Sequence, residues 1–402
     1  IRMVDVGHLL GSASIEVVVT EGDESKTIVF SGDVGNLNQP LLRDPQYMQR
    51  ADYVVMESTY GDRSHGPKPD YIASLSRILQ ETLDRGGNVV IPSFAVGRTQ
   101  EMLYFIRQIK QEGLVRGHDG FPVYVDSPLA IEATNIFNEN TLECADEETM
   151  ALIRKGVNPL LFDGLKTAVS ADESKLINTD ETPKVIISSS GMCDAGRIRH
   201  HLKHNLWRPE CTVLFVGYQS VGTLGRSIVD GAKEVKLFGE TVSVRAHVEK
   251  LAGISGHADN SGLLKWVCSF APQPKRVFVV HGEDEVAETF AARLRDELGL
   301  DAGAPYNGES WELAPLCKVA EGNHVRLKKP GREAAAMDAL PERSAPAAQQ
   351  PAKRPPASGA YGQLVLAGEK LTALIGRMQS RSAKEQTKLM RQLHLLIKKF
   401  GR

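Results

Sequence analysis

The alternation of strand-like and helix-like segments between residues 53 and 298 limits the fold of this chain more than any other feature. An apolar run at 53–56 is followed by helical spacing of large apolar residues over 69–85. The alternation continues through expected strands at 88–92, 122–125, 184–188, 212–216 and 275–280, and expected helices at 98–112, 129–139, 147–154, 194–205, 223–230, 260–269 and 284–298. This rhythm predicts right-handed βαβ crossovers and an α/β fold with a mostly parallel sheet.

The segments before residue 50 follow a different pattern. Short strands at 2–6, 15–20 and 27–31 are joined by tight glycine-containing turns, which predicts an antiparallel arrangement. Two further short strands are expected between 231 and 259, and a mixed segment follows at 301–328. The alternating part is therefore expected to be combined with an antiparallel part at the beginning of the chain.

The last seventy residues divide into a linker and a basic tail. Residues 330–360 are rich in Ala and Pro, which is typical of a linker. Residues 361–402 have helical spacing, and 370–402 contains nine Lys or Arg against one acid, Glu385. Two interpretations are open. The charge could add phosphate contacts, or the Leu/Ile stripe could pack on the body or on a second copy in a homodimer.

Composition excludes several classes of protein. The chain has 402 residues, of which 42% are hydrophobic, enough for about two or three domains. A net charge of −2 gives no global attraction to nucleic acid, so any such binding must be local. The five cysteines never form a Cys-x-x-Cys pair, which favours reduced thiols in the cytoplasm. No apolar run approaches about 18 residues, so we expect no membrane span.

Five acidic or histidine residues stand where strand-like runs end: His8, Asp33, Glu57, His257 and His281. A strand end can aim a ligand or an acid–base group into a cleft, and five such residues suggest one divided metal site. Taken singly, each has a structural alternative. It could be a satisfied core histidine, a turn aspartate or a carboxylate that caps a turn.

The order of the surrounding motifs is more specific than any one residue. The chain contains, in order, Gly7-His8-Leu9-Leu10-Gly11, Phe30-Ser31-Gly32-Asp33, Glu57-Ser58-Thr59-Tyr60-Gly61, Ser255-Gly256-His257-Ala258-Asp259 and Val280-His281-Gly282-Glu283. In this order the motifs resemble the β-CASP family of metallo-β-lactamase-fold ribonucleases, and most closely its bacterial single-chain members. That family includes the mRNA 3′-end cleavage endonucleases and, more distantly, the J-type ribonucleases. The resemblance covers residues 1 to about 328.

The resemblance implies a metallo-β-lactamase αββα sandwich, with its N-terminal part missing, and an inserted parallel α/β β-CASP domain. The implied divisions are a partial metallo-β-lactamase domain at 1–61, the β-CASP insertion at 62–220, the rest of the first domain at 221–329, the linker at 330–360 and the basic helical tail at 361–402.

The resemblance also implies roles for the five residues. His8, Asp33 and His281 are similar to ligands of two zinc ions, with Asp33 bridging them, and the zinc-activated hydroxide would attack an RNA phosphodiester bond. Glu57 and His257 are similar to the family's proton-transfer pair, in which the histidine protonates the leaving oxygen. A histidine at 281 favours RNA, because the DNA-repair branch carries an apolar residue there.

Substrate contacts are expected from two loops of the insertion. Arg98 stands at a helix start after a strand, where a guanidinium and free amides can meet phosphate. Ser189, Ser190 and Gly191 form a strand-to-loop turn that could hold a backbone phosphate. The structural alternatives are a helix cap and a tight turn. The basic helix with His200-His201-x-x-His204 is interpreted as an RNA-facing or simply solvated surface, because it lacks the glutamate of a zinc helix.

One family motif, His-x-His-x-Asp-His, does not occur in this sequence. In the family it supplies most of the metal ligands, so the 402 residues as given are expected to bind metal poorly and to lack activity. The favoured function is a zinc-dependent ribonuclease, with endonucleolytic action preferred over action from a 5′ end. The alternatives are a non-catalytic RNA-binding scaffold of the same fold and a DNA-processing hydrolase of the superfamily.

Overall fold

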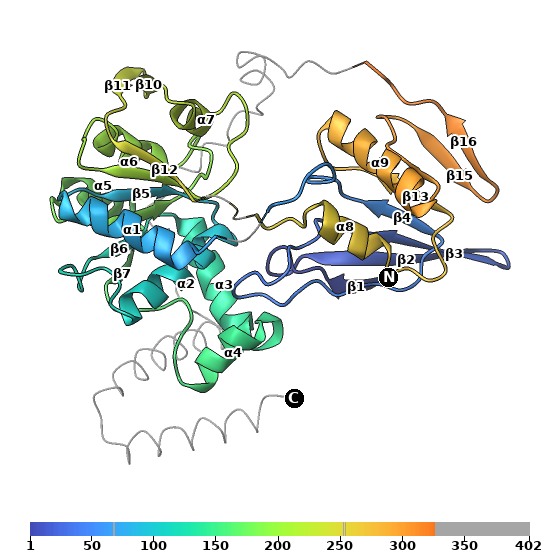
Figure 1. Ribbon diagram of the computed structural model, residues 1–402, viewed down its shortest axis with the longest axis horizontal. Coiled ribbons are helices and arrows are strands. Elements are labelled where there is room, and N and C mark those ends of the chain that lie inside the picture. Colours follow the sequence, from blue (N-terminus) through green and yellow to red (C-terminus); the bar gives the residue numbers. More distant parts are fainter. Residues whose placement is uncertain (67–68, 252, 254, 326–402) are drawn as a thin grey trace, which may run out of the picture. The chain divides into compact units, whose positions relative to one another are not determined.

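A computed structural model describes residues 1–66, 69–251, 253 and 255–325. Residues Ile1–His324 form the first compact unit of the chain. The predicted linker and helical tail lie outside the described residues. The strands of the first unit form two six-stranded sheets and two hairpins, so the predicted α/β class with parallel sheets is confirmed (Figure 1).

The first sheet combines antiparallel and parallel strands in the order β1-β2-β3-β4-β13-β14. The pairs β1–β2 and β2–β3 are antiparallel, whereas β4 pairs in parallel with both β3 and β13. Strand β14 is parallel to β13. Their bounds are β1 Arg2–Asp5, β2 Ala13–Glu21, β3 Glu24–Phe30, β4 Tyr53–Met56, β13 Arg276–Val279 and β14 Ala302–Gly303.

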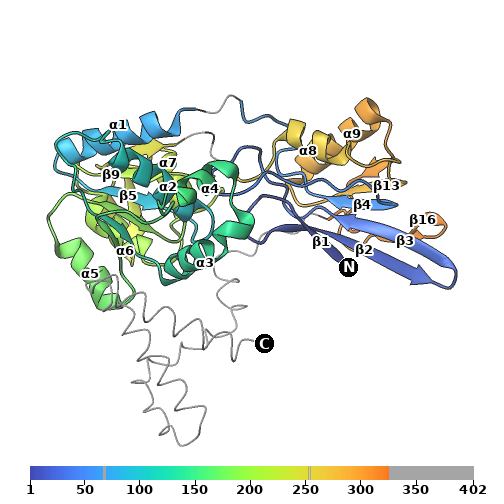
Figure 2. The same ribbon diagram turned by 90° about the horizontal axis from the view of Figure 1, so that it is seen from below.

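Helices α8 (Asn260–Val267) and α9 (Asp284–Leu298) lie on the same side of this sheet (Figure 2). Asp259 caps α8 by accepting from the Gly262 amide, and the left-handed Gly299 ends α9. The core between helices and sheet contains Val29, Val54, Val277, Trp266, Phe290 and Leu294. The hairpin of β15 (Ser310–Leu313) and β16 (Leu316–Ala320) follows β14.

The second sheet is parallel throughout, in the order β12-β9-β5-β8-β6-β7. Its central strand β5 (Val89–Pro92) is buried at every position. Val89 and Ile91 face one core and Val90 faces another, as the two-residue period of a strand requires. The other strands are β6 Val123–Val125, β7 Leu165–Thr167, β8 Val185–Ser188, β9 Thr212–Phe215 and β12 His247–Lys250.

Helices cover both faces of this second sheet. Leu79 of α1 and Ile106 of α2 pack in the same core as Val89 and Ile91. Helix α6 packs on the other face of the sheet, in the core that contains Val90. The bounds are α1 Tyr71–Asp84, α2 Arg98–Gln111, α3 Pro128–Cys144, α4 Glu147–Arg154, α5 Ala171–Thr179, α6 Ile198–Asn205 and α7 Leu224–Val229, with the hairpin strands β10 Glu234–Leu237 and β11 Glu240–Ser243.

Three features differ from the sequence-based expectation. Strand β7 and helix α5 were not predicted, because the short β7 is half-exposed and α5 is polar along most of its length. Helix α6 begins at Ile198 rather than 194, after a turn that contains Gly196 with φ of +81°. Strand β12 extends the second sheet beyond residue 220, where the insertion was expected to end.

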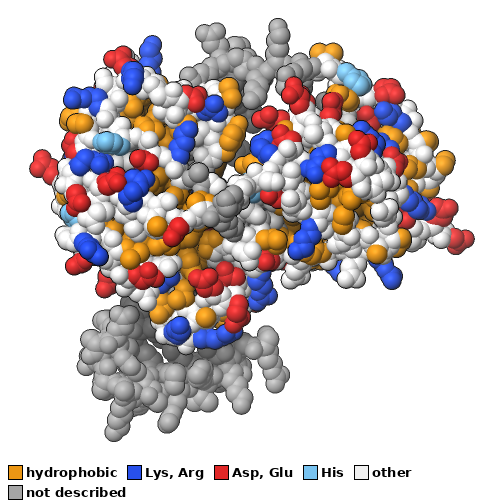
Figure 3. Space-filling model, in the orientation of Figure 1, with side chains coloured by type: hydrophobic (Ala, Val, Ile, Leu, Met, Phe, Trp, Pro, Cys, Tyr) orange, Lys and Arg blue, Asp and Glu red, His pale blue; other side chains and the backbone are white. Residues whose placement is uncertain are grey.

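Acidic and basic side chains are interspersed over the described surface in the view of Figure 3, in keeping with the net charge of −2. Within the described residues, no helix is both long and apolar enough to cross a bilayer.

Candidate functional site

The strand directions of the first sheet explain why four of the five strand-end residues meet. Strands β3, β4 and β13 run in parallel, so their carboxyl ends share one edge of the sheet. Strand β1 runs the same way, because it is separated from β3 by one antiparallel strand. The loops that leave this edge carry His8, Asp33, Glu57 and His281.

His257 reaches the same edge through a backbone bridge rather than through a strand. Gly35 and His257 form an isolated antiparallel bridge, in which the Ala258 amide donates to Val34 O at 2.7 Å. Gly35 is required there, since a Cβ at this position would overlap the backbone of Gly7. The bridge places His257 beside the residues that follow β1 and β3.

Asp33 lies between two histidines. Its Oδ2 is 3.8 Å from His8 Nε2, and its Oδ1 is 3.4 Å from His281 Nε2. Two donors bound to one tetrahedral zinc ion, each at about 2.0–2.2 Å, are roughly 3.4 Å apart. Each carboxylate oxygen of Asp33 therefore lies near the donor nitrogen of a different histidine.

The chemistry of this donor set also fits zinc. Imidazole nitrogen and carboxylate oxygen are both zinc ligands. Burial and the neighbouring His257 lower the pKa of the His8 imidazole, which favours the neutral form that binds metal. Among the described residues, one group of three or more His, Cys, Asp or Glu side chains has all its possible ligand atoms within 4.8 Å of one another. That group is His8, Asp33 and His257.

Glu57 and His257 form a close pair beside these donors. His257 Nδ1 is 3.1 Å from each carboxylate oxygen of Glu57. The Glu57 carboxylate is almost fully buried and also accepts from the Val34 amide at 2.6 Å and the Thr59 amide at 3.2 Å. The Glu57 carboxylate accepts a hydrogen bond from His257 Nδ1. The other ring nitrogen of His257, Nε2, is therefore available to a ligand at the site.

The pair shifts the pKa of both members. Burial would raise the pKa of the Glu57 carboxyl, but the hydrogen bond and charge of His257, helped by the two amides, hold it below its ordinary value. Burial would lower the pKa of His257, but the Glu57 carboxylate outweighs this and raises it. A protonated imidazole beside a carboxylate is the arrangement that a general acid needs.

One residue at this site, His65, was missed from the sequence. His65 Nε2 lies 2.9 Å from the carbonyl oxygen of His257, and its ring stands edge-on to Tyr60 with 4.4 Å between centroids. Both residues line a cavity of about 440 Å³, together with Tyr218, Gln219, Lys250 and Ser255. His65 follows no strand and belongs to no periodic pattern, so the sequence carried no signal for it.

The two predicted substrate loops meet at the carboxyl edge of the second sheet. Gly191, after β8, packs against Phe94, after β5, since a Cβ on Gly191 would lie 3.1 Å from the Phe94 ring. Gly97 in the same loop as Phe94 approaches Leu9, the neighbour of His8, so closely that a Cβ would overlap it. The loops therefore contact each other and the segment that carries His8.

Their polar groups are partly engaged. Arg98, the first residue of α2, pairs with Glu101 in its own helix and is mostly buried. Ser190 Oγ donates to Ala195 O at 3.2 Å, whereas Ser189 Oγ is buried without a partner among the described residues.

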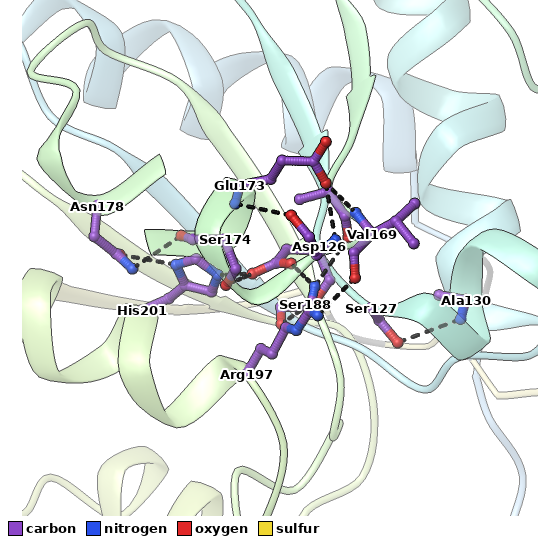
Figure 4. Close-up of polar contacts among 12 residues, drawn as sticks. Asp126, Ser127, Ala130, Val169, Glu173, Ser174, Asn178, Ser188, Arg197 and His201 are labelled. Atoms are coloured by element: carbon purple, nitrogen blue, oxygen red, sulfur yellow. Dashed lines mark hydrogen bonds and ion pairs between the residues drawn. The ribbon is translucent and has the colours of Figure 1, made fainter. Parts of the chain in front are cut away.

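The prediction that helix α6 presents a basic RNA-facing surface is wrong for Arg197 and His201. Both side chains turn inward to the buried Asp126 (Figure 4). His200 stacks on Phe238 with 4.4 Å between ring centroids, and Lys203 pairs with Glu240. The sequence could not show this, because it did not reveal that Asp126 and the β10–β11 hairpin flank the helix.

Comparison with known proteins adds two family models. A Beta-Casp domain matches residues 99–228, and a Zn-dependent metallo-hydrolase RNA specificity domain matches residues 241–305. The fold is thus a metallo-β-lactamase fold with an inserted β-CASP domain, as the sequence predicted.

Similar curated proteins come from bacteria and archaea. The ribonuclease TTHA0252 of Thermus thermophilus is 41% identical over 281 residues, which are 69% of this chain and 62% of that protein. The transcription termination factor FttA of Methanocaldococcus jannaschii is 33% identical, over 75% of this chain and 48% of its own length. An RNase J-like protein of the same archaeon is 31% identical, over 76% of this chain and 69% of its own length. The chain thus spans roughly half to two thirds of these relatives.

Proposed function

Since this chain belongs to the β-CASP family of metallo-β-lactamase-fold ribonucleases, we propose that it hydrolyses RNA phosphodiester bonds with the help of zinc. The observation that carries the proposal is the position of Asp33 between His8 and His281, with the Glu57–His257 pair beside it. Metal donors next to an oriented acid form the combination that phosphodiester hydrolysis requires.

His8, Asp33 and His281 would hold the metal, with Asp33 as the bridge between two ions. Bound zinc supplies Lewis acidity, which lowers the pKa of a nucleophilic water and offsets charge on the scissile phosphate. A catalytic zinc ion usually has three protein ligands. These three residues therefore fill only part of a two-ion site, and we expect them alone to bind zinc weakly.

His257 would act as the general acid. Glu57 holds its Nδ1 hydrogen and keeps the imidazole charged, so Nε2 can deliver a proton to the oxygen that leaves the phosphate. Glu57 itself is too buried to reach substrate and acts through His257. His65 contacts the His257 carbonyl and would restrict movement of this segment.

The substrate side of the proposal is single-stranded RNA, cut internally. Aromatic Tyr60, His65 and Tyr218 and cationic Lys250 line the cavity next to the acid, and bases stack on aromatic side chains in single-strand recognition. Backbone amides of the loops with Arg98 and with Ser189, Ser190 and Gly191 would contact phosphates. A cytoplasmic location and a homodimer remain predictions.

The test is cleavage of RNA and of DNA of the same sequence by the protein as expressed from its own gene. We expect internal cuts in RNA labelled at either end, loss of cleavage with a chelator, and recovery when zinc is restored. Cleavage of DNA with equal efficiency would reject the RNA assignment. Tight RNA binding without any cleavage in the presence of zinc would favour a non-catalytic RNA-binding scaffold.

A further inference from the structure

Asp126 is a fully buried acid outside the metal centre. It follows β6, and its carboxylate receives three hydrogen bonds (Figure 4). Arg197 Nη1 lies 2.7 Å from Oδ1, while His201 Nε2 at 2.7 Å and Ser174 Oγ at 2.5 Å contact Oδ2. Burying a carboxylate costs free energy unless hydrogen-bond donors surround it. The three donors and Asp126 therefore depend on one another.

The main chain of Asp126 fixes the beginning of the substrate loop that comes after β8. Its amide donates to Ile187 O at 2.9 Å, and its carbonyl accepts from Ser188 Oγ at 2.8 Å. Ser188 is the last residue of β8, so the next residue, Ser189, leaves the sheet from a position set by Asp126.

The side chain of Asp126 fixes the end of the same loop. Arg197 stands directly before α6 and His201 lies within it, so the carboxylate holds the point where residues 189–196 enter the helix. Arg197 also donates to Ala168 O at 2.9 Å and Val169 O at 2.8 Å. One residue thus holds both ends of one loop.

Between these ends the loop is closed on itself. The Ser190 amide donates to Ala195 O and the Ile198 amide donates to Ser189 O, both at 3.2 Å. A loop closed in this way moves as a body, and its position depends on its two anchors. It carries the Ser189 hydroxyl, which is buried and has no partner in the described part of the chain, and the Gly191 backbone, which faces Phe94.

His201 has a side-chain partner at each of its two ring nitrogens. Its Nδ1 lies 2.9 Å from Asn178 Oδ1, and the Asn178 amide nitrogen in turn donates to Ser174 O at 3.5 Å. Both ring nitrogens of His201 therefore face side-chain oxygen atoms. The contact with Asp126 uses one of these two nitrogens.

We propose that Asp126 is a positioning residue for RNA binding, because it holds the 189–196 loop where backbone amides of that loop can contact an RNA phosphate. The role rests on the proposed RNA function and extends it to a residue that does not itself touch RNA. Arg197 and His201 serve the same role from the helix side of the loop.

The first experiment measures binding of a fluorescein-labelled single-stranded RNA to the 402-residue chain by anisotropy, together with urea unfolding. Asp126→Asn keeps the shape of the side chain but removes its charge, and we expect about tenfold weaker RNA binding. The control is Asn88→Ala, which removes two buried hydrogen bonds beside the amino end of β5 and away from the loop: one of 2.8 Å to Asn205 Oδ1 on α6 and one of 3.2 Å from the Lys184 amide. It should lower stability and leave RNA affinity unchanged.

A second set of variants separates positioning from stability alone. His201→Gln keeps one donor for Asp126 and should retain most of the affinity, whereas His201→Leu should lose as much as Asp126→Asn. In a Ser189→Ala background the effect of Asp126→Asn should shrink, because both substitutions act on the same loop.

The outcomes are distinct. If the native chain binds no RNA, the proposed function fails, and the positioning role fails with it. If the native chain binds but Asp126→Asn binds equally well, only the positioning role fails. The positioning role also fails if Asn88→Ala weakens RNA binding as much as Asp126→Asn does at an equal loss of stability. It fails as well if the losses of RNA affinity caused by Asp126→Asn and Ser189→Ala are additive in the double variant.

Discussion

Glu57 and His257 are 200 positions apart in the sequence, yet each carboxylate oxygen of Glu57 lies 3.1 Å from His257 Nδ1. The carboxylate is buried and reaches the outside only through the histidine, whose side chain is about one-fifth exposed. In the proposed mechanism the pair therefore acts as one group, in which Glu57 would keep the imidazole charged and His257 would contact the substrate. A proton donor built in this way can stand beside metal ligands without being one.

His257→Ala is expected to slow RNA cleavage by about 10²–10⁴-fold, the usual contribution of a general acid, while the zinc content stays unchanged. Cleavage rates and metal analysis of the protein expressed from its own gene would check this. His247→Ala, which removes an exposed histidine of β12, is the matched control. Loss of zinc in His257→Ala would instead make His257 a ligand, in line with its distance from His8 and Asp33.

Asp33→Asn is expected to weaken zinc binding by about tenfold or more, because a neutral amide cannot replace the charged oxygens between His8 and His281. Titration calorimetry of the 402-residue chain would measure this, and the native chain itself should bind weakly. Asp52→Asn is the control, since Asp52 precedes β4 and pairs with Lys275. Equal zinc affinity in the native chain and Asp33→Asn would contradict the bridging role.

Tyr218→Ala is expected to reduce affinity for single-stranded RNA by about 1–3 kcal/mol, the value of one stacked base. Tyr218 lines the cavity beside the acid and is 55% exposed. Trp207 is equally exposed, at 53%, but does not line that cavity, so Trp207→Ala should bind RNA normally. Equal losses in the two variants would show that the cavity has no special part in binding.

Asp126 should also make stability depend on pH. Burial would raise the pKa of its carboxyl, but the hydrogen bonds from His201, Ser174 and Arg197 hold it below the ordinary value. A lowered folded-state pKa gives stabilisation that is present above the unfolded-state pKa, near 4, and is lost as the pH falls through the folded-state pKa.

Urea unfolding would test this linkage. At neutral pH the free energy of unfolding of the native protein should exceed that of Asp126→Asn by about 2–3 kcal/mol. This difference should shrink progressively below about pH 4. A difference that stays constant down to acid pH would contradict the ionised state of Asp126.

The convergence of His8, Asp33, Glu57 and His281 could be predicted, because strand ends are visible in the sequence and parallel strands end at one edge. The position of His257 could not be derived in that way. It depends on a single backbone bridge to Gly35, which leaves no periodic pattern. His257 was assigned to the site from the order of the motifs along the chain, because no local pattern indicated it.

Asp126 marks a limit of prediction from strand ends. It comes after an expected strand just as Asp33 does, but the sequence did not single it out, because its partners lie on two helices of which one, α5, was not predicted. The inward direction of Arg197 and His201 was missed for the same reason. A buried acid can be recognised from sequence only when the elements that cover it are recognised too.

The parallel pairing of β4 with β13 has a consequence for the order in which the protein is made. Tyr53 is opposite Arg276, so the chain completes the whole second sheet before it returns to the edge of the first. During synthesis His8, Asp33 and Glu57 leave the ribosome early, whereas His257 and His281 emerge only after that sheet. A growing chain, still attached to its own messenger RNA, therefore lacks His257 and His281 until the second sheet has emerged.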